Sequence, residues 1–374
     1  MSFVPWVAFL VLVFVLLALD LGVLNRKVHE ISTSEALKWT AFWIGLALLF
    51  GVGIYFMYEY HWMGIGLHEG AVGGDTKGSD ALMLYLSGYL IEKALSLDNI
   101  AVMAMIFGSF AIPLKYQHRV LFWGILGALV FRGIMIGVGA AIVSQWHVVL
   151  YIFGALLIYM AIHTTFGGDD DTDPKDKRIT KFLMKNFNYK PEITGMHFIE
   201  KIDGKTFITP LLVALVVIEF SDIIFAVDSI PAIFGITTDP FIVFTSNIFA
   251  ILGLRSLYFV LASMIEKFAG LKYAIGFILV FVGVKLLIPA GYDIYNYMNE
   301  LEGDAALQAF HLPVWTSLVV VVGSVTVGII GSLIYNSRHP EVAEKADEVA
   351  DKAVEEANEA AEEANEVAEE VKEA

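Results

Sequence analysis

The chain of 374 residues has no cysteine, and only 17% of its residues are Asp, Glu, Lys or Arg. The absence of cysteine excludes disulfides, thiolate metal ligands and a cysteine nucleophile, so any bound metal ion must meet oxygen or imidazole. The sequence also has no Walker motif, no glycine-rich nucleotide loop and no serine or cysteine nucleophile motif. We therefore expect neither ATP-driven pumping by this chain, nor an enzyme, nor a resident cofactor.

Apolar residues make up 57% of the chain, and they are gathered in long runs. A helix needs about 20 apolar residues to cross the roughly 30 Å hydrocarbon core of a bilayer. Nine runs approach or exceed 18 residues, at about 3–24, 38–58, 81–108, 119–143, 148–166, 208–236, 241–264, 271–290 and 312–335. The sequence therefore predicts an all-α polytopic membrane protein with about nine transmembrane helices.

The basic residues are distributed unequally between the two sides of these predicted spans. The connections after spans 1, 3, 5 and 7 carry many Lys and Arg residues, whereas those after spans 2, 4, 6 and 8 carry Lys77 alone. Positively charged loops stay in the cytoplasm. We expect a multi-pass protein of the cell inner (plasma) membrane whose retained first helix starts outside and whose C-terminus is cytoplasmic.

Five carboxylates fall inside the apolar runs. They are Glu92 and Asp98 in one run, and Glu219, Asp222 and Asp228 in another. A charge at mid-membrane costs roughly 2.5 to 3.5 kcal/mol, so five unpaired carboxylates would cost about 12 to 18 kcal/mol. Because this exceeds the stability of a typical protein, we expect a cation, protons, basic partners or a water-filled path to compensate them.

The two runs also resemble each other. A shift of 130 residues matches Glu92 with Asp222, Asp98 with Asp228, and Asn99 with Ser229, and shifts of 122 and 123 match further segments in the same order, including Arg132 with Arg255. The matches indicate two related three-helix units. The charge asymmetry gives them opposite orientations, and inverted repeats are typical of secondary transporters with a site at the midplane.

This organisation predicts boundaries along the chain. Residues 1–80 form two N-terminal transmembrane helices and an outer loop, and residues 81–166 form the first repeat. A cytoplasmic loop follows at 167–206, the second repeat at 207–290, and an outer loop with the last helix at 291–336. Residues 337–374 form an acidic, Ala- and Glu-rich helical tail, with fourteen acidic and three basic residues from 341 onward, and we expect a solvated helix or weak coiled coil whose protein partner is unknown.

The helical period decides which of these side chains share a face. Glu92, Ser96 and Asn99 follow one another at i, i+4 and i+7 and so lie on one stripe. Glu219 and Asp222 lie about 60° apart, whereas Asp228 points to the opposite side of a regular helix. We expect Pro231 to break this helix and to free carbonyl groups near Val227 as further oxygen ligands.

The predicted ligands all offer oxygen. They are Glu92, Asp98, Asn99, Glu219, Asp222, Asp228 and Ser229, and such a set suits hard divalent cations. Basic residues in the same spans offer an alternative, because Lys93, Arg132, Arg255 and Lys285 can pair with the carboxylates in a purely structural charge network. A proton relay without a metal ion is a third reading of the same residues.

The segments EKALSLDNIAV (92–102), FWGILGALVFRGIMI (122–136), EFSDIIFAVDSIPAIF (219–234) and FAILGLRSLYF (249–259) closely resemble the TerC family of integral membrane proteins, including its Alx-like branch. The resemblance extends over about residues 5–336. It implies a link to tellurium-resistance operons, a relationship to LysE-type transporters and, for Alx-like members, manganese export. It also implies that Glu92, Asp98, Glu219, Asp222 and Asp228 serve that activity.

These observations lead to a predicted function. We expect a transporter in the lipid bilayer that exports a divalent metal ion, Mn²⁺ by the family resemblance, with no nucleic acid as a partner. Its ligands would be Asp98 and Asp228, with the remaining carboxylates as ligands or proton acceptors. The alternative is a membrane-biogenesis or tellurite and metal-stress scaffold whose buried charges are structural. Metal selectivity, direction and coupling ion do not follow from the residues alone.

Overall fold

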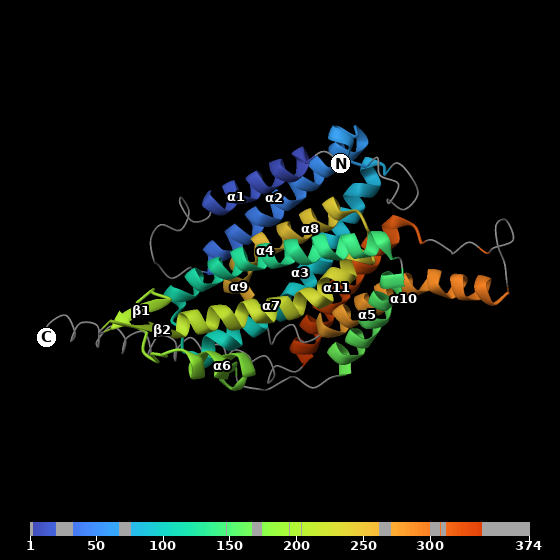
Figure 1. The fold of residues 1–374 in the computed structure, drawn as a ribbon. Helices are drawn as coiled ribbons and strands as arrows, with labels where there is room; N and C mark the ends of the chain where they lie inside the picture. Colours follow the sequence, from blue (N-terminus) through green and yellow to red (C-terminus); the bar gives the residue numbers. More distant parts are fainter. Residues whose placement is uncertain are drawn as a thin grey trace.

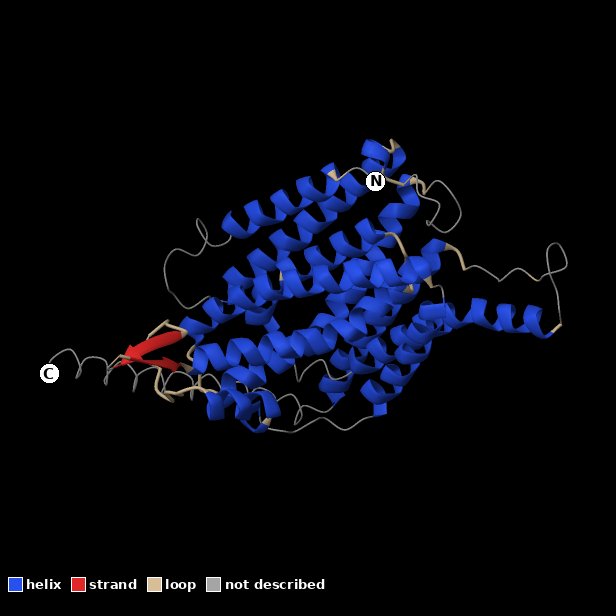
Figure 2. Ribbon diagram, viewed as in Figure 1, coloured by secondary structure: helices blue, strands red, loops and turns tan. Residues whose placement is uncertain are grey.

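The structure is a computed structural model, and it describes residues 3–19, 33–66, 76–146, 148–166, 174–193, 195–202, 204–261, 271–299, 307 and 312–338. Nearly all of its regular structure is helical, and long helices lie roughly along one direction in a bundle (Figures 1 and 2). The predicted helical tail at 341–374 lies outside the described residues.

Every predicted span corresponds to a helix. The helices that correspond to the predicted spans are α1 (Val4–Leu19), α2 (Thr33–Glu59), α3 (Gly78–Ser109), α4 (Leu114–Gln145), α5 (Val148–Phe166), α7 (Pro210–Phe234), α8 (Pro240–Leu252), α9 (Leu254–Leu261), α10 (Leu271–Met298) and α11 (Val314–Arg338). The predicted seventh span is divided between α8 and α9, because the chain turns at Gly253. A short helix, α6 (Arg178–Asn186), lies between α5 and α7.

Seven helical segments of the described residues are both long and apolar enough to cross a membrane. The helices of two further predicted spans, α1 and α3, are not among these seven. Helix α1 has only 16 described residues. Helix α3 is long enough, because its 32 residues extend over about 48 Å at 1.5 Å per residue. It is set apart by its charged residues, since Glu92, Lys93 and Asp98 lie close together in it. The prediction of an all-α polytopic membrane protein is confirmed.

Local sequence signals explain the connection between α7 and α8. Helix α8 begins with Pro240, and the side chain of Asp239 caps it by accepting hydrogen bonds from the backbone N–H groups of Phe241 (2.9 Å) and Ile242 (3.2 Å). Tyr58 on α2 donates a hydrogen bond of 2.8 Å to the other carboxylate oxygen of Asp239. A single carboxylate thus accepts hydrogen bonds from two backbone N–H groups in the first turn of α8 and also links this turn to α2.

The predicted break at Pro231 is wrong. Helix α7 continues through Pro231 to Phe234, and the carbonyl oxygen of Pro231 accepts a hydrogen bond from the backbone N–H of Gly235. Proline removes one backbone hydrogen bond. Because α7 ends only three residues after Pro231, the missing backbone hydrogen bond affects only the last turn of the helix. Asp228 therefore lies on a continuous helix.

Helix α3 lies at the centre of the bundle. It packs against α2, α7, α8 and α11, and α8 beside it is buried at every residue from Phe241 to Leu252. Helices α3 and α7 run antiparallel, since Asn99 approaches Asp222 while Met103 and Ile106 share a cavity with Ile218. Helices α4 and α7 run parallel, because Gly124 lies near Ile218 and Gly139 lies near Phe234.

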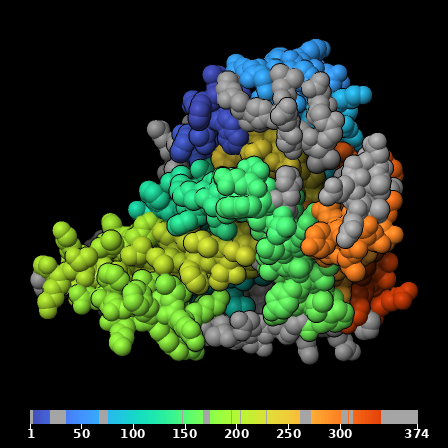
Figure 3. Space-filling view, turned by 45° about the vertical axis from the view of Figure 1, so that its right-hand side comes forward, coloured from blue at the N-terminus to red at the C-terminus, as the bar shows by residue number. Residues whose placement is uncertain are grey.

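Helices α5 and α10 approach each other very closely (Figure 3). A methyl group at Gly154 would lie 2.9 Å from the carbonyl oxygen of Gly283, and one at Gly283 would lie 2.8 Å from the carbonyl oxygen of Gly154. Backbone atoms cannot move aside as side chains do. Glycine is needed here for the contact itself, as at many helix crossings in membranes.

We expect Gly283→Ala to destabilise the protein by about 1–3 kcal/mol, because the added methyl group forces α5 and α10 apart. The measurement is the thermal unfolding of the detergent-purified protein. Gly291→Ala is the matched control on the same helix, since a methyl group there meets no atom within 4 Å. Equal midpoints for the two variants would contradict the close contact.

A small two-stranded sheet, which the sequence analysis did not predict, lies at the lysine-rich end of the bundle. Strands β1 (Ile199–Ile202) and β2 (Lys205–Ile208) pair antiparallel, near α6 and at the same end as the start of α7 (Figure 1). Most of the sheet falls within the predicted cytoplasmic loop 167–206, and the last two residues of β2 extend beyond it. Phe198, which directly precedes β1, packs against the guanidinium of Arg119, whose central carbon lies 5.2 Å from the ring centre. This contact ties the predicted loop to α4.

Candidate functional site

The predicted stripe on α3 faces the interior of the bundle. Glu92 and Ser96 are each 1% exposed and Asn99 is 3% exposed. Ser96 donates its hydroxyl to the carbonyl oxygen of Glu92 one turn earlier, at 2.5 Å. The spacing in the sequence is therefore enough to bring these polar groups to one buried face, as predicted.

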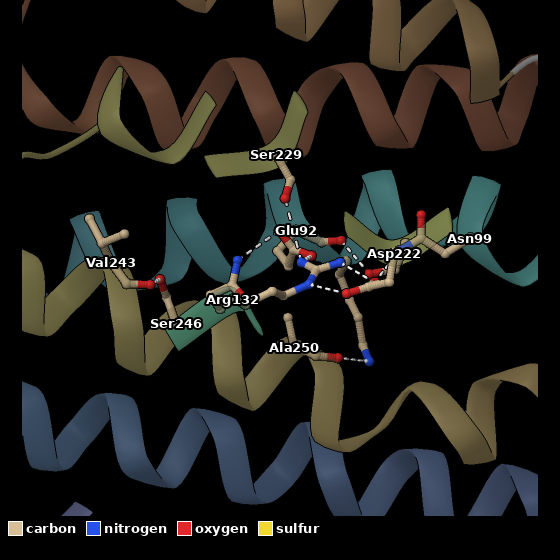
Figure 4. A network of polar contacts seen from close by, with 11 residues as sticks. Glu92, Asn99, Arg132, Asp222, Ser229, Val243, Ser246 and Ala250 are labelled. Atoms are coloured by element: carbon tan, nitrogen blue, oxygen red, sulfur yellow. Dashed lines mark hydrogen bonds and ion pairs between the residues drawn. The ribbon is translucent and has the colours of Figure 1, made fainter. Parts of the chain in front are cut away.

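Arg132 of α4 joins Glu92 and Asp222, the two acidic residues that the predicted repeat matches. Its Nε and Nη2 atoms donate hydrogen bonds to the two carboxylate oxygens of Asp222, at 3.0 and 2.7 Å. Its Nη1 atom forms an ion pair with Glu92 and lies 3.4 Å from the Ser229 hydroxyl. Figure 4 shows the guanidinium between the two carboxylates. A planar fork with several donors suits such shared, buried pairing.

Asn247 of α8 is a member of this cluster that the sequence analysis missed. It is fully buried and donates a hydrogen bond of 3.0 Å to the second carboxylate oxygen of Glu92. Its position inside the apolar run PFIVFTSNIFAIL could have indicated a buried polar site, because polar side chains within membrane spans usually face the protein interior. The shift of 123 residues used in the sequence analysis matches it with Gly124, which has no polar side chain.

Two amide oxygens in the cluster lack partners among the described residues. They are Oδ1 of Asn99 and Oδ1 of Asn247. The Nδ2 group of Asn99 lies 3.5 Å from Oδ1 of Asp222, and both residues line a cavity of about 10 Å³ between α3 and α7. This volume holds about one water-sized species. A cation there would meet amide and carboxylate oxygen together.

Glu219 lies one turn before Asp222 and also faces α4. Its position requires Gly127, because a methyl group on that residue would collide with the Glu219 carboxylate. The Oε2 atom of Glu219 is buried and accepts no hydrogen bond from any residue that the structure describes. Gly127 thus leaves room for the Glu219 side chain in the interface between α4 and α7. The sequence analysis did not assign this role to Gly127.

If the predicted metal efflux depends on Glu219, Gly127→Ala is expected to reduce that efflux by displacing the Glu219 carboxylate, with a loss of about tenfold for an effect near 1.4 kcal/mol. Gly137→Ala is the control on the same helix, since a methyl group there meets no atom within 4 Å. Efflux is measured in cells loaded with Mn²⁺, and expression of both variants is compared by immunoblot. Unchanged efflux in Gly127→Ala would show that the position of Glu219 does not matter.

The other predicted basic partners lie elsewhere. Lys93 donates a hydrogen bond of 2.8 Å to the carbonyl oxygen of Ala250, in the last turn of α8, where the helix dipole favours a cation. Lys285 donates to the hydroxyl of Ser317 on α11 at 3.1 Å. Arg255 is buried in α9. Of the four predicted charge partners, Arg132 forms ion pairs with Glu92 and Asp222.

The complete predicted metal set is not gathered into one group. Glu92, Asn99, Asp222 and Ser229 lie together around Arg132, and Asp98 is half-buried on α3. The side chain of Asp228 lies outside the described residues. Within the described part of the chain, no three His, Asp or Glu side chains are placed to hold a metal ion together. Two carboxylates share one guanidinium, so the cluster keeps one negative charge in excess.

Comparisons with known proteins agree with the resemblance seen in the motifs. Residues 77–340 match the family described as "Integral membrane protein TerC family". The "Uncharacterized membrane protein STKORF319" of Myxococcus xanthus is 41% identical over 339 residues, covering 91% of this chain and 94% of the relative. The "Putative membrane-bound redox modulator Alx" of Escherichia coli K12 is 39% identical over 335 residues, covering 89% and 95%.

The corresponding Alx protein of Photorhabdus laumondii is 43% identical over 290 residues, covering 77% of this chain and 87% of the relative. No solved structure matches the chain. The matched region contains α3 to α11 and therefore the whole cluster around Arg132. The chain belongs to the TerC family of integral membrane proteins.

Proposed function

We propose that the protein exports a divalent metal cation, Mn²⁺ in the first place, through a site between α3 and α7. The single observation that carries this proposal is the buried oxygen of Asn99, which lacks a partner in the described residues and belongs to a residue that lines a small cavity together with Asp222. Hard divalent cations bind carboxylate and amide oxygen. The absence of cysteine from the sequence disfavours softer metals.

The arrangement of α3 and α7 supports the proposed inverted repeat. The shift of 130 residues converts the pair Asn99 and Asp222 into the pair Ser229 and Glu92. The first pair lies in contact at 3.5 Å, and the second pair is bridged by the Nη1 atom of Arg132. Equivalent residues thus face each other across two antiparallel helices, the relationship expected of inverted units around a midplane site.

Helices α5 and α10 give independent support. The shift of 122 residues converts Gly154 into Gly276 and Ala161 into Gly283. Gly154 approaches the carbonyl oxygen of Gly283, and a methyl group at Gly276 would lie 3.5 Å from the carbonyl oxygen of Ala161. One close contact between these helices therefore corresponds to the other. A pseudo-two-fold axis between the two units would produce such a correspondence. Two unrelated helices could pack closely at both points without it.

Export needs a source of energy. Moving two positive charges outward against 100 mV, inside negative, costs about 4.6 kcal/mol, so a coupled ion must move inward. Protons are the natural choice because carboxylates bind them when the metal ion leaves. Glu219 is a suitable acceptor, since its Oε2 atom is buried without a described hydrogen-bond donor and it adjoins Asp222 on α7.

The test is metal flux in vesicles that contain the purified protein. With Mn²⁺ on one side, an imposed pH gradient is expected to drive Mn²⁺ toward the acidic compartment, and a fluorescent pH dye should report protons moving the other way. Ca²⁺ and Mg²⁺ are measured in parallel to establish selectivity. Protein-free vesicles control for leakage. Flux no faster than in those vesicles, for all three ions, would end the proposal.

The pairing of Arg132 with Glu92 and Asp222 also favours a second candidate, a structural scaffold that uses its buried charges to hold helices together. The acidic tail would then recruit partners. Removal of residues 341–374 separates the two functions, because a transporter core should keep most of its efflux whereas a scaffold should fail. A direct thiol-based redox role, suggested by the name of the Alx relatives, is disfavoured because the chain has no cysteine.

A further inference from the structure

We propose that Arg132 is a tethered counter-cation that occupies the carboxylate site whenever the transported metal ion is absent, and so allows the empty carrier to return across its cycle. The inference rests on the proposed function and assigns a distinct step of it to one residue. It arises from the position of the guanidinium, which lies between the acidic residues of the two repeats rather than beside either one alone.

The first argument is the use of ligand atoms. Both carboxylate oxygens of Asp222 accept hydrogen bonds from Arg132, and the remaining Nη1 atom is paired with Glu92. A metal ion that binds these carboxylates needs the same lone pairs. The guanidinium and the metal ion therefore compete for one set of oxygens.

The second argument is electrostatic. Arg132 is 1% exposed, and in such a poorly solvated place the repulsion between a guanidinium and a divalent cation is only weakly screened. Arginine keeps its proton in proteins, so it cannot relieve this repulsion by becoming neutral. It must move away from the carboxylates when the metal ion arrives.

The third argument is that acceptors lie beside the present position. The Ser229 hydroxyl is 3.4 Å from Nη1 of Arg132. Glu219 lies one turn from Asp222, faces the same helix α4, and has a carboxylate oxygen without a described partner. A short swing of a long side chain toward these groups would release Asp222 while the guanidinium keeps hydrogen-bond acceptors.

The inference distinguishes two kinds of transport. Net efflux requires the carrier to return with protons in place of the metal ion, and that return also requires Arg132, whose single positive charge pairs with the carboxylates that the protons leave ionised. Exchange of Mn²⁺ for Mn²⁺ does not require the empty carrier to reorient, because one ion replaces another on the same side of the membrane and the loaded carrier returns. A purely structural ion pair would affect both processes equally, because both depend on the same folded site.

The experiment uses the full-length protein in vesicles and compares net Mn²⁺ efflux with ⁵⁴Mn²⁺ exchange. In Arg132→Gln we expect net efflux to fall about tenfold or more while exchange stays within about threefold of wild type. Arg132→Lys should recover part of the net efflux, because it restores the charge without the fork. Lys181→Gln is the control, since Lys181 pairs with Asp176 at the exposed surface.

Equal losses of net efflux and exchange, or no loss of either, would overturn the inference. Gel filtration of each purified variant establishes that it is folded. If Arg132→Gln fails to fold, Arg132→Lys decides the matter, because a larger loss of net efflux than of exchange is still expected and equal losses still contradict it. If the wild-type protein itself moves no Mn²⁺ by either assay, the proposed function fails at an earlier step.

Discussion

The double variant Glu92→Gln/Asp222→Asn is expected to be less stable than the wild-type protein by about 3–5 kcal/mol, the usual effect of leaving one member of a buried ion pair without its partner. Both substitutions preserve side-chain size, so no large cavity is created. The loss arises because Arg132 stays charged at 1% exposure with no carboxylate left beside it among its present contacts. Thermal unfolding in detergent, followed by tryptophan fluorescence, measures the change.

The triple variant that also contains Arg132→Gln provides the matched control. It removes the unpaired charge and should recover most of the lost stability, because a neutral amide cluster costs far less to bury than an isolated guanidinium. Arg132→Gln alone should be milder than the double variant, since carboxylates can bind protons whereas arginine cannot lose one. A double variant as stable as wild type would mean that Glu92 and Asp222 do not hold Arg132 in the membrane.

Asp222→Asn is expected to lower Mn²⁺ efflux about tenfold or more, an effect of at least 1.4 kcal/mol on the transport step. Asp222 is the residue on which the observed features converge. It accepts both hydrogen bonds from Arg132, contacts Asn99 and lines the small cavity. The amide keeps the shape of the side chain but offers one oxygen, without charge, where two charged oxygens are available now.

The comparison is made in vesicles with equal amounts of reconstituted protein. Asp176→Asn is the control, because Asp176 is 65% exposed and its pair with Lys181 lies at the surface, where such pairs contribute little. Full efflux in Asp222→Asn would contradict the proposed site. A loss of efflux together with a loss of folded protein would instead assign Asp222 to the structural network tested by the double variant.

Much of the site could be predicted because it depends on local periodicity. Glu92 and Asn99 lie on one buried stripe of α3 since residues seven apart share a helix face. A shift of 130 residues in the sequence already matches Glu92 with Asp222. The predicted helix break at Pro231 is wrong for a local reason as well. Only three residues of α7 follow Pro231, so the backbone hydrogen bond that proline removes lies in the last turn of the helix.

By itself the sequence determined the class of protein, the positions of the spans and the faces that carry charge, because membrane insertion and helical period act within short segments. Only the tertiary structure decided that Arg132 joins Glu92 to Asp222 while Lys93 bonds to Ala250 and Lys285 to Ser317. It also revealed Asn247 and the need for Gly127 beside Glu219. The physical reason is that pairing between helices depends on how closely their backbones approach, which no single helix specifies.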